Sequence, residues 1–133
     1  IERLRGEEEP AAEARRYAAR LGELLGSPPS LDLVLLGLGT DGHTASLFPA
    51  SPTLAKTSWV AFEKHAPKPP PTRLTLTLAT LNAAREVLFL VSGSDKAAPL
   101  AQARRTSLPS CPAGLVAPAG RRLWFVDRAA QPG

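Results

Sequence analysis

The residues best suited to chemistry lie in the segment Gly37–Pro49, which reads GLGTDGHTASLFP. Asp41 and His43 stand close together in it. An imidazole titrates near neutral pH, so His43 is predicted to take a proton from water as a general base. Asp41 could orient that imidazole or favour its charged form. It could equally accept a backbone N–H as an Asx turn or helix cap, and both interpretations stay open.

Three glycines of the same segment predict a tight turn beside a ligand. Glycine lets the backbone bend sharply and approach a bound molecule closely. Gly42 separates Asp41 from His43 and leaves room for both side chains to face one small substrate. Gly37, Gly39 and Gly42 are therefore candidate substrate-binding residues.

The same glycines match the dinucleotide-binding pattern G-x-G-x-x-G, and Glu63 follows at about the distance of a ribose-binding acid. That pattern must open a long helix, which Pro49 and Pro52 would interrupt. His43 is also an unsuitable neighbour for a pyrophosphate packed against bare backbone. The sequence therefore argues against a nicotinamide or flavin, and no cofactor is expected.

Two cations are candidates for binding an anionic group. Lys96 follows an apolar run and the Gly93 turn, at the expected start of a helix, where free backbone N–H groups attract anions. A cation there is unfavourable unless an anion lies beside it. Arg73 heads an alternating segment after a proline-rich loop, and its planar fork suits phosphate oxygens. A charge that protects an edge strand would look the same.

The other reactive side chains carry no prediction of function. His65 lies in a Lys- and Pro-rich loop and is expected to be solvated. Cys111 has no neighbouring base, so a nucleophilic role is not expected, and as the only cysteine it cannot form an internal disulfide. No spacing of His, Cys or carboxylates resembles a zinc site, so no metal is expected.

The elements that must position these residues alternate between helical and strand patterns. Apolar residues recur at helical spacing over Pro10–Leu25. Leu31–Leu36 is an almost continuous apolar run, typical of a parallel strand covered on both faces. Val87–Val91 predicts a second buried strand, and after the Ser92–Lys96 turn a helix is expected over Ala97–Arg105.

Shorter elements complete the pattern. An alternating strand is expected over Arg73–Leu78, with leucines on one face and threonines on a wet or ligand-facing side. A short strand at Trp59–Phe62, a helical turn at Leu81–Arg85 and final strands at Leu115–Val116 and Leu123–Val126 are also expected. Strands alternating with helices predict a single α/β domain over residues 1–133, with a mainly parallel sheet.

Composition limits the classes of partner. The chain of 133 residues has a net charge of +4 and no apolar run long enough for a transmembrane helix, so no membrane partner is expected. Basic residues do not cluster with aromatics, which make up only 5%, so nucleic-acid binding is not expected. A charged N-terminus without a signal-peptide pattern and a single cysteine favour a cytoplasmic protein. The oligomeric state is not indicated.

The segment Gly37–Pro49 closely resembles the signature of the 6-phosphogluconolactonases. The resemblance continues, in the family's order, through Arg73-Leu-Thr-Leu-Thr-Leu, Leu81-Asn-Ala-Ala-Arg, Val87-Leu-Phe-Leu-Val-Ser-Gly and Asp95-Lys96-Ala97. Glucosamine-6-phosphate deaminases are similar over Gly-x-Gly-x-Asp-Gly-His but continue to an Asn-Glu-Pro ending. This chain reads Leu47-Phe48-Pro49 there, which favours the lactonase.

The resemblance implies a doubly wound α/β fold, a Rossmann-like three-layer sandwich. It implies hydrolysis of 6-phospho-D-glucono-1,5-lactone to 6-phosphogluconate in the oxidative pentose phosphate pathway, with a small phosphosugar lactone as the partner. His43 is then the base, Asp41 its neighbour, and Lys96 and Arg73 the phosphate-side groups. Two alternatives stay open: a deaminase-like isomerase in which His43 opens a ring, and a non-catalytic phosphosugar-binding fragment.

The resemblance also implies an incomplete fold. Members of the family are nearly twice as long, and their N-terminal half brings a Gly- and Ser/Thr-rich phosphate loop that this sequence lacks. The chain, which begins with Ile1 instead of Met, is therefore expected to correspond to the C-terminal half. One face or one edge of the Leu31–Leu36 strand should then lack its natural neighbour.

Overall fold

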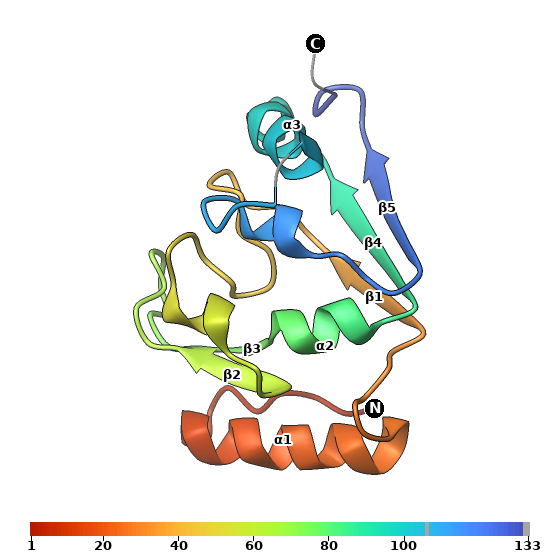
Figure 1. Ribbon diagram of the computed structural model, residues 1–133. Coiled ribbons are helices and arrows are strands. Elements are labelled where there is room, and N and C mark those ends of the chain that lie inside the picture. The colour runs from red at the N-terminus through yellow and green to blue at the C-terminus, as the bar shows by residue number, and fades with distance from the viewer. Residues whose placement is uncertain (106, 132–133) are drawn as a thin grey trace.

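The computed structural model describes residues 1–105 and 107–131, which form two β-sheets and the helices around them (Figure 1). The main sheet is parallel and has the order β1-β4-β5, from β1 (Leu33–Leu36), β4 (Glu86–Val91) and β5 (Arg121–Val126). A separate antiparallel pair joins β2 (Val60–Glu63) to β3 (Arg73–Leu76). The expected α/β fold with a mainly parallel sheet is confirmed.

Two groups of helices accompany the sheets. The α-helices are α1 (Pro10–Leu25), α2 (Leu78–Ala83) and α3 (Ala97–Arg105), and the 3-10 helices are η1 (Pro52–Ala55), η2 (Ser94–Lys96) and η3 (Pro112–Leu115). Helix α1 packs against the β2–β3 pair, whereas α2, α3 and η3 lie on one side of the main sheet (Figure 1). None of the described helices is long and apolar enough to cross a bilayer.

Helix α1 has the bounds that its sequence predicts. The Glu9 carboxylate caps it by accepting the backbone N–H groups of Ala11 and Ala12, at 3.0 and 2.7 Å. Pro10 occupies the first turn, where its missing N–H costs nothing. Gly26, with a φ of 87°, ends the helix in a conformation that other residues rarely adopt.

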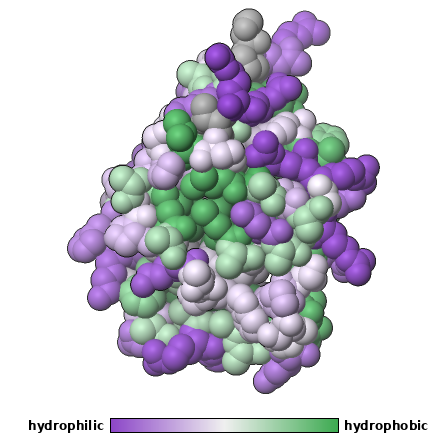
Figure 2. Space-filling view, viewed as in Figure 1, coloured by the Kyte–Doolittle hydropathy of each residue, from purple (hydrophilic) through white to green (hydrophobic). Residues whose placement is uncertain are grey.

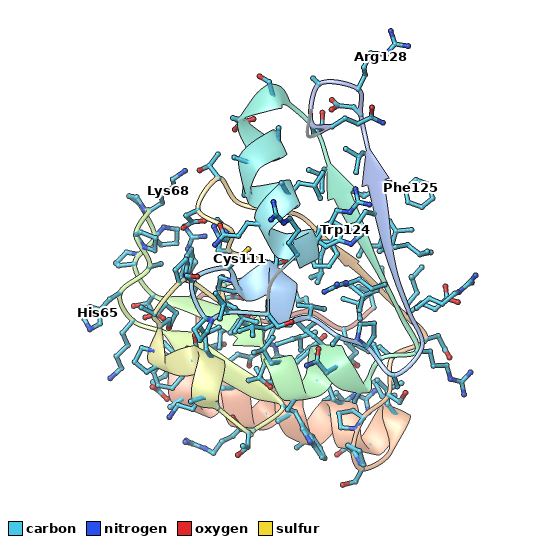
Figure 3. All side chains as sticks on the ribbon, turned by 45° about the horizontal axis from the view of Figure 1, so that its top comes forward. His65, Lys68, Cys111, Trp124, Phe125 and Arg128 are labelled. Carbon is cyan, nitrogen blue, oxygen red and sulfur yellow. The ribbon has the colours of Figure 1, made fainter. Side chains whose placement is uncertain are left out.

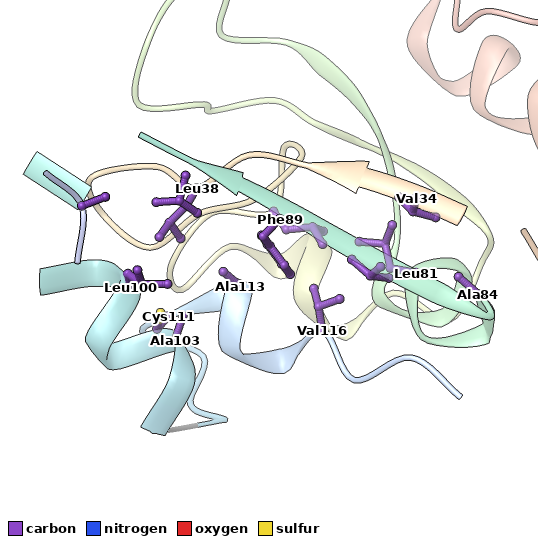
Figure 4. Packing of buried hydrophobic residues seen from close by; sticks show 14 residues of the cluster. Val34, Leu38, Leu81, Ala84, Phe89, Leu100, Ala103, Cys111, Ala113 and Val116 are labelled. Carbon is purple, nitrogen blue, oxygen red and sulfur yellow. The ribbon is translucent and has the colours of Figure 1, made fainter. Parts of the chain in front are cut away.

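The main core lies between the inner face of the parallel sheet and the helices α2, α3 and η3 (Figure 4). Phe89 of β4 is fully buried at its centre and stacks on Trp124 of β5, with ring centroids 4.1 Å apart. Leu81 from α2 and Leu100 from α3 are also fully buried against this face. In the view of Figure 2, apolar residues gather near the centre, where η3 lies in Figure 1.

No described element packs against the outer face of the main sheet. Leu33 and Leu35 of β1 are 50% and 60% exposed, and Leu90 and Phe125 on the adjoining strands are 56% and 58% exposed. Figure 3 shows Phe125 pointing away from the molecule. The expectation that β1 is covered on both faces was therefore wrong. The expectation that one of its faces lacks a neighbour is met, because no described element packs there, and β1 also forms an edge of its sheet.

Two shorter predictions were also wrong. Strand β3 ends at Leu76 and α2 begins at Leu78, and the threonine face is buried, not wet. The Thr75 hydroxyl donates to the carbonyl of Leu76 at 2.9 Å and accepts the N–H of Ser46 at 3.1 Å, so the protein itself satisfies it. Leu115–Val116 is not a strand, because Pro112 opens the 3-10 helix η3 there.

We expect the isolated chain to self-associate through the bare sheet face, because it presents apolar side chains beside an unpaired strand edge. Sedimentation velocity should show the weight-average mass rising with concentration, and Phe125→Lys should reduce that rise. Leu108→Lys is the matched control, since Leu108 is 54% exposed but lies outside the sheet. A wild-type chain that stays monomeric at all concentrations would contradict the prediction.

A buried carboxylate should make the N-terminal segment sensitive to acid. The Glu13 side chain is 2% exposed, and hydrogen bonds from Arg16, at 2.7 Å, lower its pKa from 4.5 to about 2. Because the folded pKa lies below the ordinary one, the unfolded chain binds a proton first as pH falls. The stabilisation is complete above pH 4.5 and is lost between that value and about 2. Urea unfolding at several pH values in this range should show the free energy of unfolding decreasing as the pH falls. Glu13→Gln should make that decrease smaller.

Candidate active site

The chain turns sharply after β1, and internal hydrogen bonds close the turn. The N–H of Gly39 donates to the carbonyl of His43 at 2.8 Å, and the N–H of Gly42 donates to the carbonyl of Gly39 at 3.0 Å. The Thr44 hydroxyl donates to the carbonyl of Gly37 at 2.8 Å. The turn therefore holds residues 37–44 in one arrangement at the C-terminal end of a parallel strand, where α/β proteins bind ligands.

His43 and Asp41 form a pair in this turn. Asp41 Oδ1 lies 2.5 Å from His43 Nδ1 and also accepts the backbone N–H of His43 at 3.1 Å. The carboxylate thus orients the ring and closes an Asx turn, so both interpretations of Asp41 hold together. With Nδ1–H donated to Asp41, the neutral ring keeps its lone pair on Nε2, the form that a general base requires.

The Asp41 carboxyl is held in its charged form. Burial raises its pKa, but the hydrogen bonds from the His43 backbone and ring outweigh that effect, and the net pKa lies below 3.8. The His43 side chain is only 24% exposed, and its ring lies 4.7 Å from that of buried Phe48, at a 40° tilt. An apolar wall therefore fixes one side of the imidazole and an ionised carboxylate fixes its Nδ1 edge.

Gly39 and Gly42 are required for this geometry, each for a different reason. A Cβ on Gly39 would lie 2.0 Å from His43 Nδ1 and 2.7 Å from Asp41 Oδ1, so the pair fits only against bare backbone. Gly42 has a φ of 84°, and a Cβ there would lie 2.9 Å from the sulfur of Cys111. Cys111 is fully buried beneath the turn, and burial raises the pKa of its thiol.

A cleft of about 420 Å³ opens beside the turn and joins it to two other loops. Its described lining residues are Gly37, Leu38, Gly39, Thr40, His43, Thr44, Ala45, Lys68 and Lys96. The cleft thus brings together His43, Lys96 and two of the predicted glycines, whereas Gly42 and Asp41 do not line it. No acidic side chain is among the described lining residues, so the cleft is suited to an anion.

Lys96 reaches the cleft from η2, at the end of β4. Its Nζ lies 3.2 Å from Asp95 Oδ2, and its side chain is 22% exposed. Asp127, which follows β5, holds the turn that precedes Lys96. Its carboxylate accepts the Ser92 hydroxyl at 2.6 Å and the Gly93 N–H at 3.1 Å. The Ser92 hydroxyl is the main cause of a lowered Asp127 pKa. Asp127 was not expected from the sequence, because it reaches this turn only through the pairing of β5 with β4.

Arg73 does not line the cleft. Its guanidinium donates to the backbone carbonyls of Lys68, Pro69 and Pro70, at 2.8, 3.1 and 3.1 Å. These bonds fix the loop between β2 and β3, which places Lys68 in the cleft wall. Figure 3 shows Lys68 on this loop, with His65 farther along it and exposed as expected. Sequence reasoning missed Lys68, since nothing in the local pattern separates it from a solvated lysine.

A second cavity, larger than this cleft, lies between α1 and β2. It has a volume of about 500 Å³ and a mostly apolar surface. Glu63, the acid that would have bound a ribose, lies here, where it accepts hydrogen bonds from the Ser51 hydroxyl and the His65 N–H. Glu63 therefore lines a different cavity from the cleft at the glycine turn.

Comparison with known proteins identifies the family. Residues 2–125 match the model of the glucosamine-6-phosphate isomerases/6-phosphogluconolactonase family. The chain belongs to this family. It is 46% identical over 122 residues to the human protein named 6-phosphogluconolactonase, covering 88% of this chain and 47% of the human one. The match lies in the C-terminal half of such relatives, as expected.

Solved structures of the family have the same fold. The crystal structure of the devB protein gives a TM-score of 0.88 at 36% identity, covering 98% of this chain and 57% of that one. The structure titled 6-phosphogluconolactonase from Trypanosoma cruzi gives 0.77 at 31% identity, covering 90% and 50%. This family member therefore spans about half the length of the relatives that it matches.

Proposed function

We propose that the polypeptide containing this chain hydrolyses 6-phospho-D-glucono-1,5-lactone to 6-phosphogluconate, with His43 as the general base. The observation that carries the proposal is the His43–Asp41 pair, which frees Nε2 to accept a proton in a cleft that also holds Lys96. The relatives named 6-phosphogluconolactonase support the choice of substrate.

The proposed reaction needs one proton to move twice. His43 Nε2 takes a proton from water while the water oxygen bonds to the lactone carbonyl carbon. The tetrahedral intermediate then collapses, the bond from that carbon to the ring oxygen breaks, and the imidazolium gives its proton to the departing oxygen. Asp41 stabilises the imidazolium through Nδ1–H without taking the proton itself. Such a base contributes about 10² to 10⁴ in rate.

Product analysis separates this function from its alternatives. The polypeptide in which these residues naturally occur should accelerate loss of the lactone above its spontaneous rate and yield the acid. Glucosamine 6-phosphate should give neither ammonia nor a ketose phosphate. Release of ammonia would support the deaminase-like alternative instead, and phosphosugar binding without any turnover would support a binding module.

The surroundings of the cleft support the proposal that the site needs more chain than these residues. In a doubly wound sheet the ligand lies where two halves of the sheet diverge, and both halves supply walls. This chain supplies the His43 and Lys96 walls, while its outer sheet face is bare. We propose that full activity requires a complementary segment corresponding to the other half of its relatives.

Lys96 is proposed to bind the substrate phosphate as a point charge. We expect Lys96→Ala to weaken binding of 6-phosphogluconate by about tenfold or more, because a charge-assisted contact is lost, and to leave binding of unphosphorylated gluconate nearly unchanged. Calorimetric titration with both ligands measures the difference. Equal losses for the two ligands would remove Lys96 from the phosphate site.

A further inference from the structure

The loop between β2 and β3 places a second lysine in the cleft. Lys68 shares the wall with His43 and Lys96, although it comes from a separate part of the chain. Its side chain makes no hydrogen bond or ion pair within the described residues. Lys96, by contrast, has Asp95 beside it. Lys68 is therefore a cation without a counterion, held at the edge of a cleft that has no acidic lining residue.

Backbone contacts fix the loop that carries Lys68. The N–H of Ala66 donates to the carbonyl of Pro71 at 2.9 Å and closes the base of the loop. Above that bond, Arg73 Nη2 donates to the carbonyls of Lys68 and Pro69, and Arg73 Nε donates to that of Pro70. Through Nε and Nη2 this guanidinium therefore holds three consecutive carbonyls of the loop backbone.

Arg73 also connects this loop to the His43 turn. Its guanidinium lies over the ring of Phe48, 5.6 Å from the centroid, and that ring packs against the imidazole of His43. Phe48 is 5% exposed, so the stack is fixed on its inner side. The loop and the turn are therefore docked against each other through one stacked arginine.

We propose that Lys68 is a second cation for the anionic phosphate of the substrate, working with Lys96, and that Arg73 is the positioning residue that places it. The inference rests on the proposed function and deepens it. Two point charges from separate loops suit a dianionic group better than one. Arg73 acts through the loop backbone and does not touch the ligand.

Three variants and a control test this in the natural polypeptide. Lys68→Met removes the charge. Arg73→Lys keeps a charge but lacks the planar fork through which Nε and Nη2 hold the three carbonyls, and the third variant combines the two. Lys64→Met is the matched control, because Lys64 belongs to the same loop but lies over Phe62, away from the cleft. Each protein is titrated with 6-phosphogluconate and with gluconate, and its kcat and KM for the phosphorylated lactone are measured.

We expect Lys68→Met and Arg73→Lys each to weaken binding of 6-phosphogluconate by about tenfold, to leave gluconate binding unchanged and to raise KM more than they lower kcat. The double variant should bind no more weakly than Lys68→Met alone, because Arg73 acts through Lys68. Lys64→Met should bind like the wild type.

Other outcomes would overturn the inference. Wild-type binding by Lys68→Met would remove Lys68 from the phosphate site, and additive losses in the double variant would show that Arg73 contacts the ligand itself. Failure of the proposed function would give a different result. The wild-type protein would then either bind 6-phosphogluconate without hydrolysing the lactone or not bind it at all. If it binds without hydrolysis, the titrations with Lys68→Met still decide the role of this lysine.

Discussion

Replacing His43 with alanine should lower kcat for the proposed hydrolysis of 6-phosphogluconolactone by about 10² or more in the polypeptide that contains this chain. The ring is the only imidazole among the described cleft residues, and the contact of its Nδ1 with Asp41 leaves Nε2 to accept a proton. KM should change little, because the base acts mainly in the transition state. Initial rates must be corrected for spontaneous hydrolysis of the lactone.

The second histidine of the chain provides the control for that experiment. His65 is exposed on the β2–β3 loop and does not line the cleft, so His65→Ala should retain wild-type turnover. The kcat of Asp41→Asn should lie between those of His43→Ala and His65→Ala, because it keeps the size of the side chain but removes the charge that stabilises the imidazolium. A His43→Ala enzyme that keeps most of its turnover would end the general-base proposal.

Gly39→Ala should lower kcat nearly as much as His43→Ala, although it adds only a methyl group. The new Cβ would lie 2.0 Å from His43 Nδ1 and 2.3 Å from Cε1, so the imidazole must move. A displacement of about 1 Å in a catalytic group can cost about 10² in rate, and we expect a loss of kcat of that size. The change should also raise the pKa of Asp41, because its hydrogen bonds from His43 stretch.

Gly37→Ala adds a methyl group to the cleft wall without displacing the imidazole, so it tests whether the loss comes from the moved ring. A Cβ on Gly37 meets no heavy atom within 4 Å, so this variant should fold with an undisturbed turn. Comparison of the two variants by kcat and by thermal unfolding separates a displaced base from a collapsed turn. Wild-type kcat in Gly39→Ala would mean that the turn can relax without moving the imidazole, and the geometric argument would fail.

The parts of the fold that were predicted correctly are those whose causes are local. Helix α1 has its expected bounds because its helical periodicity, Pro10 and Gly26 all lie within the same stretch. The pairing of Asp41 with His43 is equally local, since the residues are close in sequence and share one turn. Short-range chemistry of this kind can be read directly from the residue order.

Apart from the Leu115–Val116 strand, where Pro112 acts locally, the errors and omissions have long-range causes. Burial of the Thr75 hydroxyl depends on Ser46, which lies far away in the sequence. Lys68 lies in the cleft wall on a loop whose backbone Arg73 holds from farther along the chain. Asp127 supports the turn before Lys96 through the pairing of β5 with β4. The bare face of β1 has the same origin: an apolar strand predicts that a cover exists without saying which chain segment supplies it.

The packing of Cys111 beneath the turn supplies a native reporter of the site. Its sulfur lies 4.0 Å from the carbonyl oxygen of Gly42, and it is the only cysteine in the sequence. A buried thiol with a raised pKa reacts with an alkylating reagent only when its surroundings open. The rate at which Cys111 is labelled therefore measures how often the turn that carries His43 opens. The ratio of the labelling rates without and with 6-phosphogluconate would give the free energy by which the ligand stabilises the closed turn.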